Sequence, residues 1–169
     1  MSLQKSHVAS HVLAAAVLMP LAVAAQAQTT KSETRFEDWI VACDDATGSK
    51  KCSLSQTFTK QGTGEVVLAW VLVKSAEGKL HAILYTPTQV LLQPGPKVEA
   101  GTLAPLVAPY RYCAPQACVA ELDFPDDWLA TFRTGAEYSV TFQPVNQNPA
   151  TVKGSLKGFT AAFDFFSKQ

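Results

Sequence analysis

The stretch YRYCAPQACVAELDFPDDWLATFRTGAEYSVTFQPVNQNPATVKGSLKGFTAAFDFFSK, residues 110–168, decides the fold of this chain. Within it, residues 119–124 alternate apolar and polar side chains, which predicts a strand. Residues 125–133 predict a helix, because a proline and two acidic residues open it and Gly135 follows it. Strands are expected at 136–143 and 151–156. Residues 158–167 carry an apolar stripe at helical spacing, which predicts a short terminal helix, with a strand as the alternative.

The residues before this stretch predict further short strands. Residues 36–43 and 52–58 alternate, with Trp39, Val41 and Cys43 on one face of the first strand. Residues 65–75 are hydrophobic on both faces, which is typical of a central strand covered on both sides. Residues 79–86 predict another strand. Residues 97–101 and 103–112 are expected at sheet edges, since Pro105 and Pro109 donate no backbone hydrogen bond.

Short strands at regular spacing, joined by turn-rich segments, predict a mostly β protein. The expected architecture is an antiparallel β-sandwich with one or two short helices, and a closed barrel is the alternative.

The N-terminus has the features of a secretory signal peptide. Lys5 precedes an apolar run from Val12 to Ala25, and Ala25-Gln26-Ala27 fits the signal-peptidase pattern. The apolar run is shorter than the roughly 20 residues of a membrane-spanning helix. We therefore predict a signal peptide at 1–27, a flexible leader at 28–34 and a single domain at 35–169. The processed protein is expected in the periplasm, or associated with the outer membrane or cell surface, with no transmembrane span.

The charge of the chain is balanced, with 14 basic and 14 acidic side chains. A nearly neutral protein has no electrostatic reason to bind nucleic acid or anionic lipid. Nucleic acid is therefore not an expected partner.

Four cysteines, Cys43, Cys52, Cys113 and Cys118, lie in the part expected to be exported. In an oxidising compartment an even number is typical of disulfides, and three pairings are open. Pairing nearest neighbours closes short loops, each plausible across a turn. Zinc is the rival use of four thiols, but neither C-x8-C nor C-x4-C matches the usual zinc spacing. Structural disulfides are the expected role.

The sequence contains no recognisable catalytic constellation. It has no G-x-S-x-G motif, and His81 is the only histidine after the signal peptide. The acidic pairs Asp44–Asp45 and Asp126–Asp127 suggest, as an alternative, a small hydrolase or a calcium-dependent enzyme. Neighbouring acids usually point apart, however, and helix capping accounts for the second pair. We expect no catalytic residue, no cofactor and no metal.

The aromatic side chains are expected mainly in the core. They include Trp39, Trp70, Trp128 and the C-terminal phenylalanines. The functional alternative is an exposed aromatic patch that contacts another protein. An edge strand at 103–112 is a second candidate contact, because an unpaired edge accepts a partner strand.

The order and spacing of five short patterns resemble the invasion-associated locus B family of bacterial envelope proteins. In chain order the patterns are Phe36-x-x-Trp39-x-Val41-x-Cys43, Cys52-x-Leu54-x-Gln56, Cys113 to Cys118 followed by Ala120, Gly135 ahead of a strand, and Ser155-Leu156-x-Gly158-Phe159. The proline-rich residues 86–101 depart from the family pattern.

The resemblance implies an exported, Ig-like β-sandwich of the envelope with two local disulfides, Cys43–Cys52 and Cys113–Cys118. The family is named for a virulence role in host-cell invasion, and it offers no catalytic residues to carry over. The expected function is a secreted, non-enzymatic interaction module with an unidentified protein or envelope partner, serving invasion or envelope integrity. Its oligomeric state is left open.

Overall fold

Two antiparallel sheets and two helices build the part of the chain that the computed structural model describes, residues 31–45 and 49–169. The larger sheet has seven strands and the smaller has four. In spatial order the larger sheet contains β1 (Lys31–Phe36), β2 (Trp39–Asp44), β3 (Lys51–Thr59), β4 (Val66–Lys74), β5 (Leu80–Thr86), β9 (Cys118–Asp123) and β8 (Tyr110–Cys113). The smaller contains β11 (Ala150–Ser155), β10 (Glu137–Phe142), β6 (Lys97–Ala100) and β7 (Leu106–Val107). The helices are α1 (Asp126–Thr134) and α2 (Phe159–Ser167).

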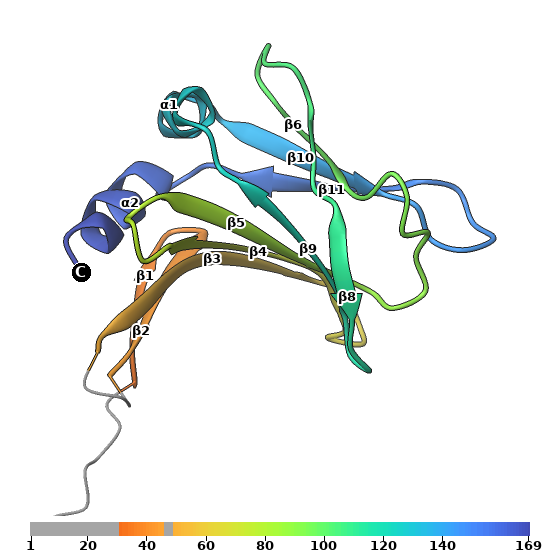
Figure 1. Ribbon diagram of the computed structural model, residues 1–169, viewed down its shortest axis with the longest axis horizontal. Coiled ribbons are helices and arrows are strands. Elements are labelled where there is room, and N and C mark those ends of the chain that lie inside the picture. The colour runs from red at the N-terminus through yellow and green to blue at the C-terminus, as the bar shows by residue number, and fades with distance from the viewer. Residues whose placement is uncertain (1–30, 46–48) are drawn as a thin grey trace, which may run out of the picture.

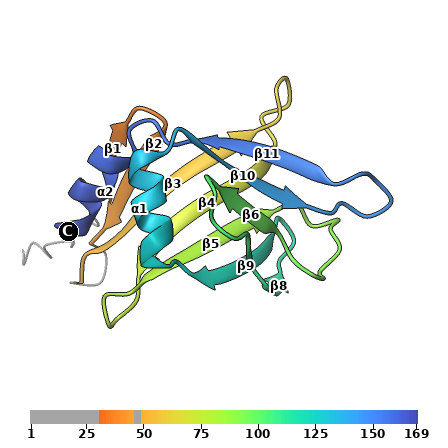
Figure 2. The ribbon, with the colours of Figure 1, turned by 90° about the horizontal axis from the view of Figure 1, so that it is seen from above.

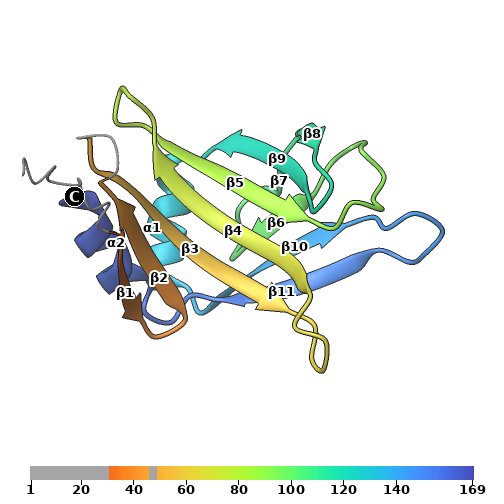
Figure 3. The ribbon, with the colours of Figure 1, turned by 90° about the horizontal axis from the view of Figure 1, so that it is seen from below.

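The smaller sheet and both helices cover the same face of the larger sheet (Figure 1). Seen from above, α1 and α2 lie over one end of the larger sheet, and β10 and β11 run toward the other end (Figure 2). From below, β2 to β5 lie in front of every other layer (Figure 3). The predicted antiparallel β-sandwich with two short helices is therefore confirmed. The terminal apolar stripe forms a helix, α2, as predicted.

The side chains that fill the core come from alternate positions of each strand. In β2 the buried residues are Trp39, Val41 and Cys43, as the alternation predicts. In β4 they are Leu68, Trp70 and Leu72. The ring of Trp70 lies 5.3 Å from that of Tyr138 on the smaller sheet. Burying each large apolar side chain contributes about 1.5–3 kcal/mol, so this aromatic contact between the layers is a main source of stability.

One buried amide joins the two sheets by hydrogen bonds. The side chain of Gln56 on β3 donates to the backbone oxygens of Asp38 at 3.2 Å and Ser155 at 3.0 Å. Its own oxygen accepts a hydrogen bond from the Tyr138 hydroxyl at 3.1 Å. The indole of Trp39 donates to the same Ser155 oxygen at 3.0 Å. These bonds fix the end of β11 against β2 and β3, just before α2 begins.

Helix α2 closes the core at this end of the sandwich. Gly158, at its start, has a φ of 80°, and a Cβ there would collide with the backbone oxygen of Phe36. Glycine is therefore required for the helix to approach the β1–β2 turn so closely. Phe159 and Phe166 are buried beneath the helix. At its other end, Lys74 Nζ donates to the Ser167 carbonyl at 2.7 Å and lies 5.2 Å from the Phe166 ring centroid.

The first strand corrects the predicted leader. Residues 31–34, expected within a flexible leader at 28–34, belong to β1, which pairs with β2 along its whole length. Their side chains are mostly exposed, so the backbone ladder rather than apolar burial holds them in place. The predicted signal peptide at 1–27 and residues 28–30 lie outside the described residues.

The prediction that both faces of β4 are covered is also wrong. β4 is central in its sheet, but only one face is buried. Val67, Ala69, Val71 and Val73 point to the other face, where they are half-buried by neighbouring side chains. Hydrophobicity on both faces of one strand does not reveal whether a second layer covers both.

The predicted edge strands are confirmed only in part. β6 is not an edge, because it pairs with β10 on one side and β7 on the other. Residues 103–112 do not form one strand: β7 ends the smaller sheet and β8 ends the larger. Pro109 lies between them, so the chain crosses from one sheet to the other at a residue that donates no hydrogen bond.

Replacing Tyr138 with phenylalanine should destabilise the protein and change its response to alkali. The variant leaves a buried Gln56 oxygen without its donor, which costs about 1–3 kcal/mol in the free energy of unfolding. Burial raises the pKa of Tyr138 well above its usual value. The unfolded phenol ionises from about pH 10, so the stability of the native protein should fall as the pH rises above that point.

Urea unfolding at neutral pH and at several alkaline pH values checks both effects. Above about pH 10, the free energy of unfolding should fall less steeply with pH in the variant than in the native protein. It should not vanish, because burial also raises the pKa of Tyr85 and Tyr110. Tyr112→Phe, at an exposed position, is the control. An unchanged alkaline slope in Tyr138→Phe would contradict the assignment.

Replacing Lys74 with methionine should loosen the end of α2. Methionine keeps the apolar stem but loses the charge that faces the helix carbonyls and the Phe166 ring, and the expected cost is about 0.5–1 kcal/mol. Thermal unfolding measures it. Lys79→Met is the matched control, since Lys79 lies beside the same cavity without such contacts. Equal effects of the two substitutions would argue against capping by Lys74.

Candidate functional site

The two acidic pairs lie on separate elements and form no joint site. Asp44 ends β2, with Lys31 Nζ 4.0 Å from its carboxylate, and Asp45 follows it in an exposed position. Asp126 and Asp127 open α1, where the Asp127 carboxylate accepts the backbone N–H of Trp128 at 2.9 Å. In residues 31–45 and 49–169, no three His, Cys, Asp or Glu side chains gather as metal ligands would. The acids therefore lend no support to the hydrolase or calcium alternative.

His81 lies on the open face of the larger sheet. The cross-strand register places it opposite Asp123, and its ring nitrogens lie 3.2 Å from Asp123 and 3.6 Å from Glu121. Arg111 contacts Glu121 at 3.5 Å. The partners of His81 are carboxylates, so the cluster lacks the nucleophile that a histidine base would activate.

All four cysteines form the two local disulfides that were expected. Cys43 and Cys52 lie directly opposite each other on β2 and β3, with Cα atoms 4.0 Å apart. Cys113 and Cys118 are likewise opposite on β8 and β9. Each bond clips one pair of neighbouring strands, so the thiols are used for structure.

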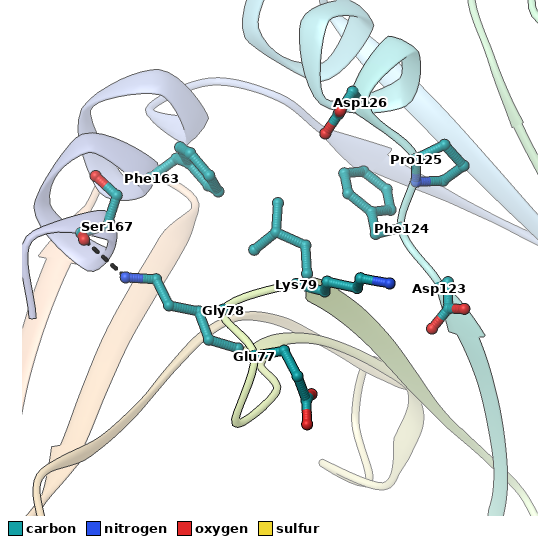
Figure 4. A pocket seen from close by; sticks show the side chains of 11 residues that line it. Glu77, Gly78, Lys79, Asp123, Phe124, Pro125, Asp126, Phe163 and Ser167 are labelled. Carbon is teal, nitrogen blue, oxygen red and sulfur yellow. Dashed lines mark hydrogen bonds between the residues drawn. The ribbon is translucent and has the colours of Figure 1, made fainter.

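A cavity of about 710 Å³ lies between the β4–β5 hairpin, the start of α1 and the end of α2 (Figure 4). Figure 4 shows the acidic side chains of Glu77, Asp123 and Asp126 on separate walls. A hydrogen bond from the Ser75 hydroxyl lowers the pKa of Glu77, which is exposed. Both signs of charge line the cavity, and its carboxylates do not converge on one point. The geometry selects no particular ligand.

A second region stands out at the opposite end of the molecule, away from the helices. Two segments, residues 87–96 and 143–149, lie side by side there, and together they are called the loop tip (Figure 1). Leu91, Leu92 and Val145 are 48%, 53% and 39% exposed. Neither segment contains an Asp, Glu, Lys or Arg, although such residues make up 17% of the chain. The loop tip therefore exposes three aliphatic side chains and carries no charge.

Hydrogen bonds tie the two segments of the loop tip together. The Leu91 N–H donates to the Gln143 oxygen at 2.7 Å, and the Val145 N–H donates to the Gln89 oxygen at 3.0 Å. The side-chain amide of Gln143 donates to the carbonyls of Pro144 at 2.9 Å and Gln147 at 2.6 Å. Val90 and Phe142 are buried beneath the surface with Cys118. The tip is thus built on a small core of its own.

A glycine fixes the base of the first segment. Gly95 has a φ of 101°, and a Cβ at this position would collide with the backbone oxygen of Ala108. The Ala108 N–H also donates to the Pro96 oxygen at 3.0 Å. Residues 87–96 are therefore held against the link between β7 and β8, and the exposed leucines have a defined position.

The sequence did not identify the loop tip as a site. The proline-rich residues 86–101 were noted only as a departure from a family pattern. A signal was available: residues 82–96 and 138–152 are two long runs without a charged side chain. Their proximity depends on the pairing between Val90 and Pro144, which no local pattern announces.

Most aromatic side chains of the described residues lie in the core. Trp39, Trp70, Trp128 and Phe132 are buried, as are Phe159, Phe163 and Phe166. Tyr112, on β8, is 58% exposed, and Phe165 is exposed at the other end of the molecule. The aromatic residues therefore serve the core, in agreement with the expectation.

Comparison with known proteins gives consistent matches. The family described as "Invasion associated locus B (IalB) protein" matches residues 39–167. Invasion protein B homologues of Brucella abortus strain 2308 and of Brucella abortus biovar 1 strain 9-941 are each 31% identical over 137 residues, which is 80% of this chain and 79% of theirs. The crystal structure of invasion associated protein b from Bartonella henselae has a TM-score of 0.71 at 20% identity, covering 80% of this chain and 94% of that one.

The structural match shows a shared fold. The matches in sequence show in addition that the proteins belong to one family. The family resemblance drawn from the cysteine and tryptophan patterns is thereby confirmed. This chain belongs to the invasion associated locus B family.

Proposed function

We propose that this chain is an exported, envelope-associated interaction module without catalytic activity, and that the loop tip is its contact surface. In this role the single domain, predicted at 35–169 and extended by β1 to residue 31, serves host-cell invasion or the integrity of the envelope. The observation that carries the proposal is the exposure of Leu91, Leu92 and Val145 on two hydrogen-bonded segments that contain no charge.

The composition of the loop tip favours contact with another surface. Single exposed hydrophobic residues are ordinary in soluble proteins, but an apolar cluster is typical of an interaction site. Contact surfaces are also depleted of charge at their centre, because a desolvated charge without a partner is costly. The loop tip combines both features, whereas the cavity at the helix end is lined by charges of both signs.

The rigidity of the loop tip supports the same role. The bonds from Leu91 and Val145, together with the close approach of Gly95 to Ala108, define the surface before any partner arrives. A preorganised surface loses little conformational entropy on binding. Binding free energy is therefore not reduced by the cost of ordering the loops.

Export and envelope association rest on separate grounds. The predicted signal peptide at 1–27 would direct the chain out of the cytoplasm. Two disulfides are typical of an oxidising compartment such as the periplasm. No helix among the described residues is long and apolar enough to span a bilayer. The names of the relatives refer to invasion, which supports a role at the cell envelope.

Association with native envelope membranes tests the proposal. The processed chain, purified from the periplasm, should co-sediment with membranes from cells that lack it. In the double variant Leu91→Gln/Leu92→Gln, the fraction that co-sediments should fall at least about fivefold, because two exposed apolar side chains are lost. Thermal unfolding and circular dichroism establish that the variant is folded.

Val66→Gln is the matched control for this experiment. Val66 is 49% exposed on β4, next to the β3–β4 hairpin, which diverges from the loop tip (Figure 2). The control should bind as the native chain does. Equal binding of the native chain and the double variant, or no binding by either, would refute the loop tip as the contact surface.

A further inference from the structure

The chemistry of the loop tip points to a particular partner. Resting on the proposed function, we propose that Leu91, Leu92 and Val145 insert shallowly into the surface of a lipid bilayer whose headgroups carry no net charge. The bound protein would lie on the membrane without crossing it.

The identity of the exposed side chains favours lipid over a protein partner. Energetically dominant residues at protein interfaces are most often Trp, Tyr and Arg, while Leu and Val are under-represented among them. The three most exposed apolar residues of the loop tip are aliphatic. Aliphatic side chains gain free energy on entering the boundary between headgroups and acyl chains, which needs no complementary pocket.

The absence of charge selects the kind of lipid. Residues 87–96 and 143–149 contain no lysine or arginine that would attract anionic headgroups, and no carboxylate that they would repel. Lys97, which follows the first segment, is paired with Glu99 at 3.0 Å. Binding should therefore depend on apolar burial, with little contribution from surface charge.

Some backbone groups of the loop tip do not need water as a hydrogen-bond partner. Five of its residues are prolines, which have no N–H to desolvate: Pro87, Pro94, Pro96, Pro144 and Pro149. The N–H groups of Leu91 and Val145 donate across the two segments. The Gln143 amide satisfies two carbonyls of the second segment. In an apolar medium an unpaired backbone group costs free energy, so these features remove part of the cost of insertion.

The shape of the molecule allows the insertion. The loop tip lies at one end of the longest axis, and the helices lie at the other end (Figure 1, Figure 3). Gln89, Gln93, Asn146, Gln147 and Asn148 are exposed in the same two segments. Their amides both donate and accept hydrogen bonds, so they suit the phosphate and ester oxygens at the level of the headgroups.

Flotation with protein-free vesicles tests the inference. The probe is a vesicle of phosphatidylcholine and phosphatidylethanolamine, and a second set contains added phosphatidylglycerol. The processed chain, with its new N-terminus verified by mass spectrometry, should float with the neutral vesicles. The bound fraction should change little between low and high salt, because no charge pairing carries it. Adding phosphatidylglycerol should not strengthen binding.

The variants locate the surface. Leu91→Gln/Leu92→Gln should reduce the bound fraction about fivefold or more, and Val145→Glu should also reduce it because a carboxylate resists transfer from water. Val66→Gln should bind as the native chain does. Each variant is compared by circular dichroism and thermal unfolding, so that lost binding is not lost folding.

Two results would overturn the lipid inference in different ways. Binding that requires phosphatidylglycerol and disappears in salt would assign the attraction to charges elsewhere on the chain. Binding to native envelope membranes, combined with no binding to protein-free vesicles, would assign the loop tip to a protein partner and leave the proposed function standing. Failure in both preparations would refute both proposals.

Discussion

The buried amide of Gln56 is the constraint on which the arrangement of the two sheets depends. Apolar packing between layers is non-directional, so it does not by itself fix how far one sheet slides over the other. Gln56 fixes this position because it bonds the Asp38 and Ser155 backbones and accepts the Tyr138 hydroxyl. All of its partners are close to the point where β11 leads into α2. A single side chain thus sets the register between the layers and the entry of the terminal helix.

The two ends of the sandwich consequently differ in chemistry. At the helix end, Lys74 joins the larger sheet to α2, and Arg133 of α1 contacts Asp164 of α2 at 2.7 Å. At the other end, β10 and β11 extend beyond this anchor, and the segment around Val90 packs against them. The loop tip, in contrast, carries no charged side chain. The same topology that secures one end leaves the other free to make contacts.

The sequence predicted what local periodicity controls and missed what tertiary contact controls. Alternation placed Trp39 and Cys43 on the buried face of β2, since the strand period is a property of the backbone. It did not show that the outer side of Val71 lacks a covering layer, because that depends on where distant elements pack. Residues 31–34 were mistaken for a leader because strand pairing at an edge requires no apolar side chain. The loop tip was missed for a related reason, because it unites two segments about 50 residues apart through one bridge.

The exposed side chains of Leu91 and Leu92 are not needed for the stability of the fold. The core at this end is supplied by Val90, Phe142 and Cys118, which are buried without them. Polar residues at positions 91 and 92 would satisfy the fold equally well, because the local backbone is held by bonds from main-chain groups and by Gly95. A rigid support that presents aliphatic side chains to water is poorly explained by folding alone. It accords with the proposal that this surface leaves water when it contacts a partner.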